Sequence, residues 1–446
     1  MAAFFLVAAF VLSAGFAKLM AICANWICAQ RLAKKLVFAD KTLNLVLIAA
    51  YPLLLIIGLG FDGPRFLAGG RSLDLSMGWW LPITAGGLGF ILLVRSTVGY
   101  WRYRPPACEI TVESHLVDLR LRFRDNGRSW RDVLVGPGPM RRIALLPGNE
   151  QFTIEVSTKT YALPRLPAAW NGLSLVHLSD CHFRGGVTRA FFEAVCDEAA
   201  ALKPDLFVFT GDLLDDQRLL DWLPETLGRL TAPWGRYFIL GNHDWYLNPE
   251  AIRGEFTRLG WIDLAGNCVA LGNCVALPVP SPPSSGERVR VRGASGDRVL
   301  SAECRVSEVG LNSISAVSPQ LSAVSPAPSL ILCGDETPWM GTHPELSPTP
   351  ADAFRILLSH TPDNITWARR HGIDLMLSGH THGGQIRLPI LGPVYSPSRF
   401  DCRFASGVFW LDPTLLYVSR GLSGKEPIRY NCTPEVTKLV LKSTTG

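Results

Sequence analysis

At 446 residues the chain exceeds one average domain of about 100–200 residues, and its 48% hydrophobic content favours a part that lies in lipid. Its formal net charge of +5, with no long block of like charge, argues against a nucleic-acid-binding arm, so no nucleic-acid partner is predicted. The 11 cysteines form no C-x-x-C pair, which indicates reduced thiols and a soluble part facing the cytosol.

Three apolar stretches occupy the first hundred residues: Ala2 to Ala29, Leu43 to Phe61, and Trp79 to Val94. The first two are about long enough to span a bilayer core, which needs roughly 20 residues, and the third is at the lower limit. Each could instead be a buried core helix, and the first a cleaved signal peptide. A signal peptide begins with basic residues, and no Lys or Arg precedes Lys18, so we expect a retained anchor of about three transmembrane helices.

Basic residues are unevenly divided between the loops that flank these stretches. The groups that follow the first and third stretches are Arg31, Lys34, Lys35 and Lys41, and Arg95, Arg102 and Arg104. In the intervening loop two arginines are balanced by two aspartates. The positive-inside rule therefore predicts a multi-pass membrane protein with the N-terminus outside and everything after Arg95 in the cytoplasm.

The remaining chain divides by its hydrophobic pattern. Residues 1–104 are the expected membrane anchor, and residues 105–165 form a strand-rich linker region with short alternating apolar runs. From 166 to 446, apolar strands alternate with amphipathic segments such as Thr188–Leu202, Leu219–Leu230 and Pro249–Leu259, the rhythm of an α/β domain. This rhythm fails at about 272–328, where a tandemly repeated hexapeptide is followed by Ser-, Pro- and Gly-rich sequence, so we expect a low-complexity insertion there.

Five polar motifs each follow an apolar strand-like run of the α/β part. They are Asp180-Cys-His182, Gly211-Asp212-Leu-Leu-Asp215, Gly241-Asn242-His243-Asp244, Ser359-His360, and Gly379-His380-Thr-His382-Gly-Gly. Open α/β folds hold ligands at the carboxyl ends of their strands, so these side chains should gather at one edge. Any one motif alone could be an ordinary turn or a helix cap, but five in order are hard to explain structurally.

The residue types in these motifs are those of a metal centre. Asp-x-His puts two ligands on one side of an extended segment, and the carboxylate of Asp212 can bridge two cations. A mixed set of imidazole, amide and carboxylate donors suits Mn²⁺, Fe or Zn²⁺, and no cysteine cluster suggests a structural zinc. Two cations about 3.5–4 Å apart could bind phosphate oxygens and a bridging hydroxide, which indicates metal-assisted phosphoester hydrolysis.

These motifs resemble the calcineurin-like metallophosphoesterase superfamily, and the segments from Gly379, Val418 and Asn431 resemble its membrane-associated YkuE/YaeI-like subgroup. The resemblance runs from about Leu163 to Lys442 without the insertion. It implies a four-layer α/β/β/α sandwich and two divalent ions, with Mn²⁺ first and Fe, Zn²⁺ or Mg²⁺ as alternatives.

The resemblance also implies a role for each motif residue. One metal would take Asp180, His182, Asp212 and His382, and the other Asp212, Asn242, His360 and His380. His243 would face the leaving-group oxygen as acid, and Asp215 would orient its imidazole. Cys181, where the subgroup usually has Leu, occupies a non-ligand position.

Several other polar residues have readings that compete. His177 is more readily a core histidine than a ligand, and Asp335 and Glu336 are more readily part of a solvated loop than of the site. Arg387 and Arg420 could clamp phosphate or form ordinary salt bridges.

We therefore expect a membrane-tethered hydrolase of phosphodiester or pyrophosphate bonds whose substrate is lipid-linked, because tethering favours targets in the same surface. The resemblance supplies one candidate, UDP-2,3-diacylglucosamine in lipid A synthesis. A phosphoprotein phosphatase and an inactive membrane scaffold with a phosphoesterase fold are the alternatives. The complete ligand set counts against the scaffold.

Overall fold

The computed structural model describes residues 2–59, 77–123, 129–271, 330–346 and 353–444. The expected low-complexity insertion at about 272–328 lies outside the described residues.

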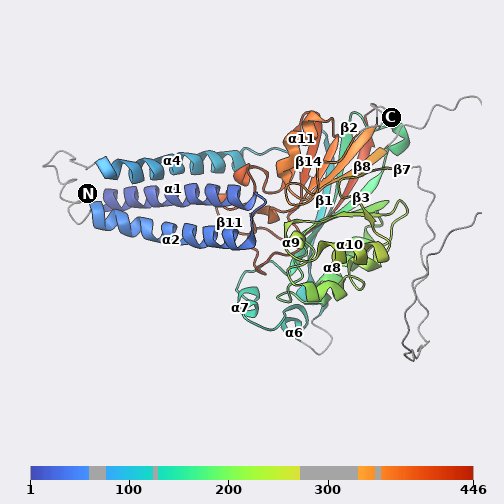
Figure 1. Ribbon diagram of the computed structural model, residues 1–446, viewed down its shortest axis with the longest axis horizontal. Helices are drawn as coiled ribbons and strands as arrows, with labels where there is room; N and C mark the ends of the chain where they lie inside the picture. Colours follow the sequence, from blue (N-terminus) through green and yellow to red (C-terminus); the bar gives the residue numbers. More distant parts are fainter. Residues whose placement is uncertain (1, 60–76, 124–128, 272–329, 347–352, 445–446) are drawn as a thin grey trace, which may run out of the picture. The chain divides into compact units, whose positions relative to one another are not determined.

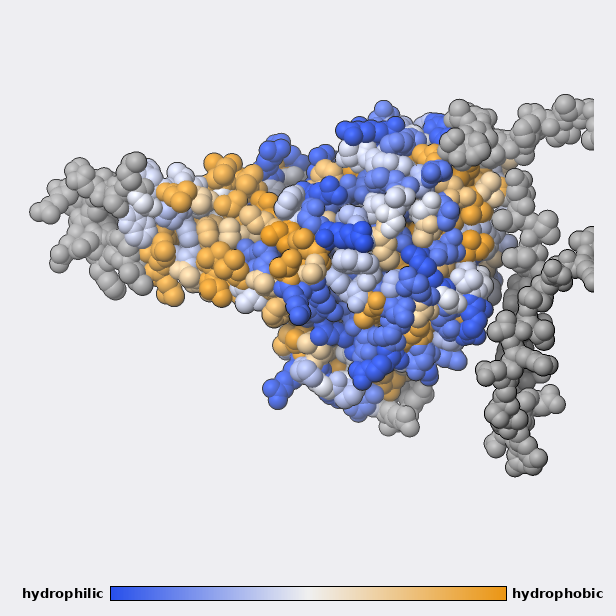
Figure 2. All heavy atoms as spheres, viewed as in Figure 1, coloured by the Kyte–Doolittle hydropathy of each residue, from blue (hydrophilic) through white to orange (hydrophobic). Residues whose placement is uncertain are grey.

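Three long helices precede the sheet domain and lie side by side (Figure 1): α1 (Ala2–Cys28), α2 (Lys34–Leu59) and α4 (Met77–Trp101). Each is long and apolar enough to cross a membrane, with candidate spans Leu6–Cys28, Lys34–Ile56 and Gly78–Trp101. Hydrophobic residues gather over these helices, while hydrophilic residues dominate the sheet domain (Figure 2). The second helix begins at Lys34, nine residues before the expected Leu43, and the third helix continues beyond Val94 to Trp101. Lys and Arg residues can continue a helix past its apolar stretch, because their long side chains reach water while their stems cover apolar surface.

Glycines let α1 and α4 approach closely. A Cβ atom on Gly89 would lie 1.9 Å from the carbonyl oxygen of Gly15, and one on Gly15 would lie equally close to that of Gly86. Small residues at such a crossing allow backbone-to-backbone packing, which drives association where lipid removes the hydrophobic effect. The α2 helix joins them through Tyr51, whose hydroxyl donates to the Pro82 carbonyl at 2.5 Å and whose ring stacks on Phe16.

The rest of the described chain builds two large mixed sheets. The seven-stranded sheet has the order β1-β2-β15-β3-β4-β5-β6, and the six-stranded sheet has the order β13-β14-β10-β9-β8-β7. The strands of the first are β1 (Glu109–Asp118), β2 (Thr153–Leu163), β15 (Glu435–Ser443), β3 (Ser174–Leu178), β4 (Leu206–Thr210), β5 (Arg236–Ile239) and β6 (Ile262–Asp263). Those of the second are β13 (Gly407–Leu411), β14 (Thr414–Val418), β10 (Leu375–Ser378), β9 (Phe354–Ser359), β8 (Leu330–Asp335) and β7 (Cys268–Leu271).

Short helices and one small ribbon complete the domain. The helices are α5 (Leu119–Arg122), α6 (Trp130–Leu134), α7 (Met140–Ala144), α8 (Arg189–Ala201), α9 (Asn242–Trp245), α10 (Pro249–Arg258) and α11 (Ile365–Arg370). The ribbon pairs β11 (Arg387–Leu388) with β12 (Gly392–Pro393). The expected amphipathic segment Leu219–Leu230 forms 3-10 turns, Gln217–Trp222 and Leu227–Arg229, in place of an α-helix. Its Pro224 removes the backbone donor that an α-helix interior requires.

Three hydrophobic cores separate four layers. The two sheets face each other across the second core, α8 and α10 cover the outer face of the first sheet, and α11 covers the second. Alternation along β4 shows why: Leu206 and Val208 enter the core between the sheets, while Phe207 and Phe209 enter the one under the helices. The expected α/β/β/α sandwich, preceded by three apolar helices, is confirmed.

One pair of cysteines departs from the expectation of reduced thiols throughout. Cys268 on β7 and Cys333 on β8 stand opposite each other, with Cα atoms 4.1 Å apart, and form a disulfide. This spacing is close to the roughly 4.5 Å of a non-hydrogen-bonded antiparallel pair, so strand register alone brings the sulfurs together. The pair therefore does not assign the domain to one side of a membrane.

The helices dock on the segment that runs from β11 to β13. Lys18 of α1 is buried and pairs with the Asp401 carboxylate at 2.5 Å, and Asn25 donates to the same carboxylate at 2.8 Å. At the end of α4, the Trp101 ring donates to the Ile390 carbonyl at 2.6 Å, and the Tyr103 hydroxyl to the Val408 carbonyl at 2.9 Å. These contacts fix the sheet domain against the C-terminal ends of α1 and α4.

Candidate metal centre

The loops after five strands of the two sheets carry the motif residues and converge. Strands β3, β4 and β5 come from one sheet, and β9 and β10 from the other. The nine side chains predicted for the site follow these strands: Asp180, His182, Asp212, Asp215, Asn242, His243, His360, His380 and His382. The structure brings all of them together, at the carboxyl edges where α/β sheets hold ligands.

One group could hold a metal ion between β3, β4 and β10. Ligand atoms of Asp180, His182, Asp212 and His382 all lie within 4.8 Å of one another. The Nε2 atoms of His182 and His382 are 3.2 Å apart, and His182 Nε2 is 3.5 Å from Asp212 Oδ2. These are the residues that the family resemblance implies for the first metal.

A second group shares Asp212 with the first. Asp212 Oδ2 lies 3.3 Å from His360 Nε2, which is also 3.2 Å from His380 Nδ1 and 3.1 Å from Asn242 Oδ1. A single carboxylate oxygen therefore lies between two donor groups, as a bridging ligand requires.

Hydrogen bonds to backbone carbonyls fix which ring nitrogen of each histidine carries a lone pair. His360 Nδ1 donates to the Thr210 carbonyl at 2.7 Å, and His382 Nδ1 donates to the Ser423 carbonyl at 2.9 Å. A carbonyl only accepts, so Nδ1 of each ring carries a proton, and in the neutral ring Nε2 presents a lone pair to the centre. This is the outer hydrogen bonding typical of metal-ligating histidines.

Two buried atoms of the centre lack any hydrogen-bond partner among the described residues, namely Asp212 Oδ2 and His380 Nε2. An unpaired buried carboxylate oxygen is costly, as are lone pairs that face each other. Divalent cations would satisfy both, so the donor set fits the two ions that the sequence predicts.

The carboxylates give the centre a field that favours positive charge. Burial opposes a charged imidazole, yet Asp215, Asp212 and Asp180 together raise the pKa of His182 to about 9. Burial likewise opposes charge on His360, and Asp212 raises its pKa to about 9. The same field attracts a metal ion, whose own charge displaces these protons.

Backbone strain is concentrated here. Five non-glycine residues of the site have positive φ angles in the left-handed region: Asp180 (56°), His182 (48°), Asp212 (58°), His380 (69°) and His382 (51°). Such conformations cost about 1–3 kcal/mol each and persist at sites where the surroundings impose them. The strain turns these side chains toward the centre, and glycines make room: a Cβ on Gly241 would lie 2.2 Å from Asp212 Oδ1.

Asp215 and His243 form a pair beside the first group. Asp215 Oδ1 accepts from His243 Nδ1, and its Oδ2 lies 3.3 Å from His182 Nδ1. Burial alone raises the pKa of the Asp215 carboxyl, but the two imidazoles more than reverse this and lower it. The backbone nitrogen of His243 donates to Asp212 Oδ1 at 2.8 Å, which fixes its position next to the shared carboxylate.

Two supporting acids were not assigned a role from the sequence. Asp244, in the same motif as His243, is buried and accepts from the backbone nitrogens of Asp212 and Gly241, each at 2.9 Å. Burial, and then the Asp212 charge, raises its pKa to about 6. Glu336 accepts from the Leu240 nitrogen at 2.6 Å and so supports the loop that carries Asn242.

The solvated-loop expectation for Asp335 and Glu336 is wrong, because both are buried. Asp335 accepts from His343 Nδ1 at 2.8 Å, and Glu336 forms an ion pair with Arg253. The end of β8 is buried by the loop after β5, a contact between distant parts of the sequence. Local composition does not indicate such burial, so the two acids were predicted to be solvated.

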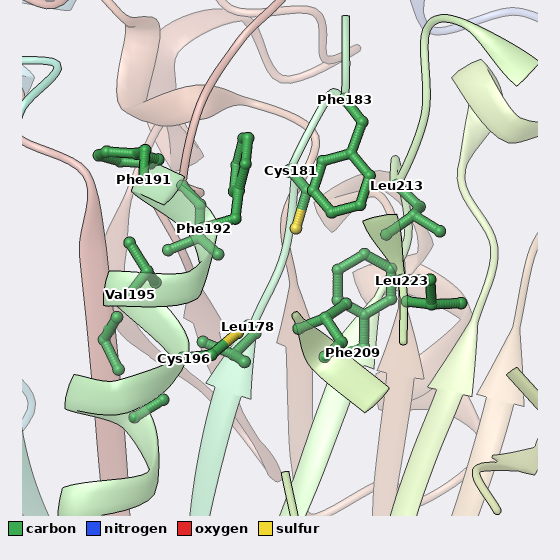
Figure 3. Close-up of a cluster of buried hydrophobic side chains, with 14 of the residues drawn as sticks. Leu178, Cys181, Phe183, Phe191, Phe192, Val195, Cys196, Phe209, Leu213 and Leu223 are labelled. Atoms are coloured by element: carbon green, nitrogen blue, oxygen red, sulfur yellow. The ribbon is translucent and has the colours of Figure 1, made fainter. Parts of the chain in front are cut away.

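The other competing readings resolve into structural roles. His177 lies outside the centre, where it bonds Thr210 Oγ1 at 2.8 Å, and burial lowers its pKa to about 4. Arg420 is a salt-bridge residue, paired with Glu155 and Glu435 at 2.9 Å each. Cys181 is 1% exposed and lies among the aromatic side chains of the core under α8 (Figure 3), as expected of a non-ligand position.

The centre lies next to the turn that joins the first two helices. The Tyr246 hydroxyl, at the end of α9, donates to the Leu32 carbonyl at 2.8 Å. Arg31 and Lys34 lie over the rings of Trp245 and Tyr246, with the cations 5.4 and 5.7 Å from the ring centroids. The candidate metal centre is thus held at one end of the apolar helices.

Two facing sheets with an Asp- and His-rich centre at their shared edge define a metallophosphoesterase. Residues 173–384 match the sequence profile of the family described as "Calcineurin-like phosphoesterase". Over this segment the chain is similar to that family, and the site residues lie within the matched segment.

Relatives agree with this assignment. The chain is 28% identical over 300 residues to the "Uncharacterized metallophosphoesterase YkuE" of Bacillus subtilis, covering 66% of this chain and 88% of the relative. It is 26% identical over 329 residues to the "UDP-2,3-diacylglucosamine pyrophosphatase LpxG" of Chlamydia muridarum, covering 64% and 89%. A "Transmembrane protein with metallophosphoesterase domain" of Danio rerio is 30% identical over 284 residues, covering 62% of this chain and 55% of that protein.

Proposed function

We propose that this protein is a membrane-anchored, dinuclear-metal phosphoesterase that hydrolyses a phosphodiester or pyrophosphate bond in a lipid-linked substrate. The observation that carries the proposal is the contact of Tyr246 with Leu32, which ties the α9 loop of the metal centre to the α1–α2 turn. A substrate held in the bilayer would present its head group at that level. Residues 1–104 act as the anchor in this proposal.

Each residue has a distinct task in the proposed reaction. Asp180, His182 and His382 would hold one ion, Asn242, His360 and His380 the other, and Asp212 both. When bound, the ions, Mn²⁺ for preference, neutralise phosphate charge and lower the pKa of water.

His243 serves the leaving group. Its side chain is 24% exposed, so it can reach a substrate, and Asp215 holds its Nδ1 proton so that Nε2 faces outward. A protonated Nε2 would donate a proton to the departing oxygen. General acid catalysis of this kind contributes about 10²–10⁴-fold to the rate.

UDP-2,3-diacylglucosamine is the candidate substrate, because the Chlamydia muridarum relative is named for its hydrolysis and aligns over 89% of its own length. The test is a screen of the full-length, Mn²⁺-loaded protein in mixed micelles against this lipid, bis-p-nitrophenyl phosphate and a phosphopeptide. We expect metal-dependent release of UMP from the lipid, lost in Asp212→Asn. Preference for the phosphopeptide would establish a protein phosphatase, and no turnover of any substrate would establish the scaffold.

The proposed orientation places the metal centre in the cytoplasm, where the basic residues Arg31, Lys34 and Arg95 at the docked ends of the helices would face. A phosphatase reporter fused to the C-terminus, active only outside the cytoplasm, should be silent. An active reporter would reverse the orientation and exclude a cytoplasmic nucleotide-lipid as substrate.

A further inference from the structure

A large cavity lies where α1 and α4 meet the segment from residue 387 to 409. It measures about 1100 Å³, slightly more than the roughly 300–1,000 Å³ typical of small-molecule sites. Its charged lining comprises Arg95, Arg102, Arg387, Arg399, Arg403 and Asp401. None of the predicted metal ligands lines it, so it is separate from the metal centre.

The positive charge of this arginine cavity is poorly balanced. The one carboxylate of the lining, Asp401, is already engaged by Lys18 and Asn25. In the described part of the chain, Arg95, Arg102 and Arg403 form no ion pair with a carboxylate. Positive charges that line one cavity repel one another, and an anion bound in that cavity would reduce the repulsion.

The two remaining arginines differ in how available they are to an anion. Arg387 is held by neutral groups, since it donates to the Gly383 carbonyl at 2.8 Å and to Ser406 Oγ at 2.5 Å. Arg399 is less available, because its Nε atom lies 3.6 Å from the Asp363 carboxylate and forms an ion pair with it. The planar guanidinium fork matches the oxygens of a phosphate group.

The other wall of the arginine cavity is apolar and continues onto the membrane-facing surface. Ile22 of α1 and Leu92 of α4 line it. Beside them on α4, Ile91 and Leu88 are 65% and 54% exposed, as residues in contact with lipid chains would be. Trp101, with its ring bonded to the loop at Ile390, marks the level at which tryptophans lie in the membrane interface.

We propose that the arginine cavity binds an anionic phospholipid, with the phosphate among the arginines and the acyl chains along α4. Basic pockets between transmembrane helices are suited to anionic lipid head groups. A free phosphate or nucleotide would satisfy the arginines but would leave the adjoining apolar surface unused. The proposal is independent of the reaction at the metal centre, because it concerns other residues.

The test measures lipid binding to the full-length protein in neutral detergent by native mass spectrometry. Phosphatidylglycerol, phosphatidylcholine and inorganic phosphate are titrated separately. The parent should bind phosphatidylglycerol in preference to phosphatidylcholine, and inorganic phosphate should not displace it. Displacement by phosphate at comparable concentration would overturn the lipid assignment.

Two matched triple variants locate the site. Arg95→Gln, Arg102→Gln and Arg403→Gln together should weaken phosphatidylglycerol binding by at least about tenfold, because basic residues near a membrane surface attract anionic lipids. The control removes the same charge from exposed arginines that do not line the cavity: Arg142→Gln, Arg218→Gln and Arg370→Gln. Equal affinities in the two triple variants would refute the proposal.

Folding is checked by the thermal unfolding of each variant. Should the cavity triple variant not fold, the single reversal Arg403→Glu serves instead, since that side chain is exposed and its guanidinium lies over the Phe404 ring. It should lower phosphatidylglycerol binding more than Arg370→Glu does, and the opposite order would overturn the proposal.

Discussion

Replacing Asp215 by Asn tests the chemistry of the metal centre most directly. Its two carboxylate oxygens each face an imidazole Nδ1, one from His243 and one from His182 at 3.3 Å. Asparagine has a single oxygen, so one ring would face an amide NH₂ group instead. Loss of one hydrogen bond to a charged acceptor costs about 1.5–3 kcal/mol, which predicts a fall in turnover on the order of 10- to 150-fold.

The assay is hydrolysis of bis-p-nitrophenyl phosphate at increasing Mn²⁺, with bound metal measured in parallel. If the lost bond is the one to His243, kcat falls at saturating metal; if it is the one to His182, the metal requirement rises. Asp216→Asn is the control, because among the described residues this neighbouring carboxylate forms an ion pair with Arg218 alone. Equal turnover by the Asp215 and Asp216 variants, at every metal concentration, would refute the assigned role.

Three further outcomes follow from the packing and charges. Gly89→Ala should destabilise the purified full-length protein by about 1–3 kcal/mol in thermal unfolding, whereas Gly87→Ala, whose added Cβ meets nothing within 4 Å, should not. Gly241→Ala should lower bound metal, measured by elemental analysis, because its Cβ would overlap the shared carboxylate; unchanged metal content would contradict this close approach. Burial raises the pKa of Glu435, but the charge of Arg420 more than reverses this and lowers the pKa from an ordinary 4.5 to about 2. The ionised carboxylate therefore stabilises the folded state by about 3 kcal/mol above pH 4.5, and this contribution is lost as the pH falls toward 2. Glu435→Gln should therefore unfold more readily than the parent at pH 7, with the difference shrinking in acid.

The metal-centre residues could be predicted because their signal is local. Asp180 lies two residues beyond the end of β3, and His382 lies four residues beyond the end of β10. Their side-chain types alone restrict the chemistry of the site. The uninterrupted apolar run of β4 likewise indicates a strand buried on both faces. Sequence reasoning succeeds where the contacts it needs are a few residues apart.

Other parts of the structure depend on contacts between residues far apart in the sequence, which no local pattern predicts. β2 pairs in parallel with β15, which is the C-terminal strand. Together β1 and β2 extend the seven-stranded sheet that carries Asp180 and Asp212. Cys268 and Cys333 meet only because β7 and β8 share a register. The arginine cavity is likewise assembled from residues near 95 and near 403, so composition could not reveal it.

The docking of Asp401 on Lys18 has a practical consequence for biochemistry on this protein. Because the ion pair joins a membrane helix to the sheet domain, a truncation that begins at Pro105 would leave Asp401 without its cation and remove the contacts of Trp101 with Ile390 and of Tyr103 with Val408. A soluble fragment would therefore differ from the intact protein in the segment from β11 to β13, which follows His382 of the metal centre. Kinetic constants measured on such a fragment would describe an altered catalyst rather than an unanchored one.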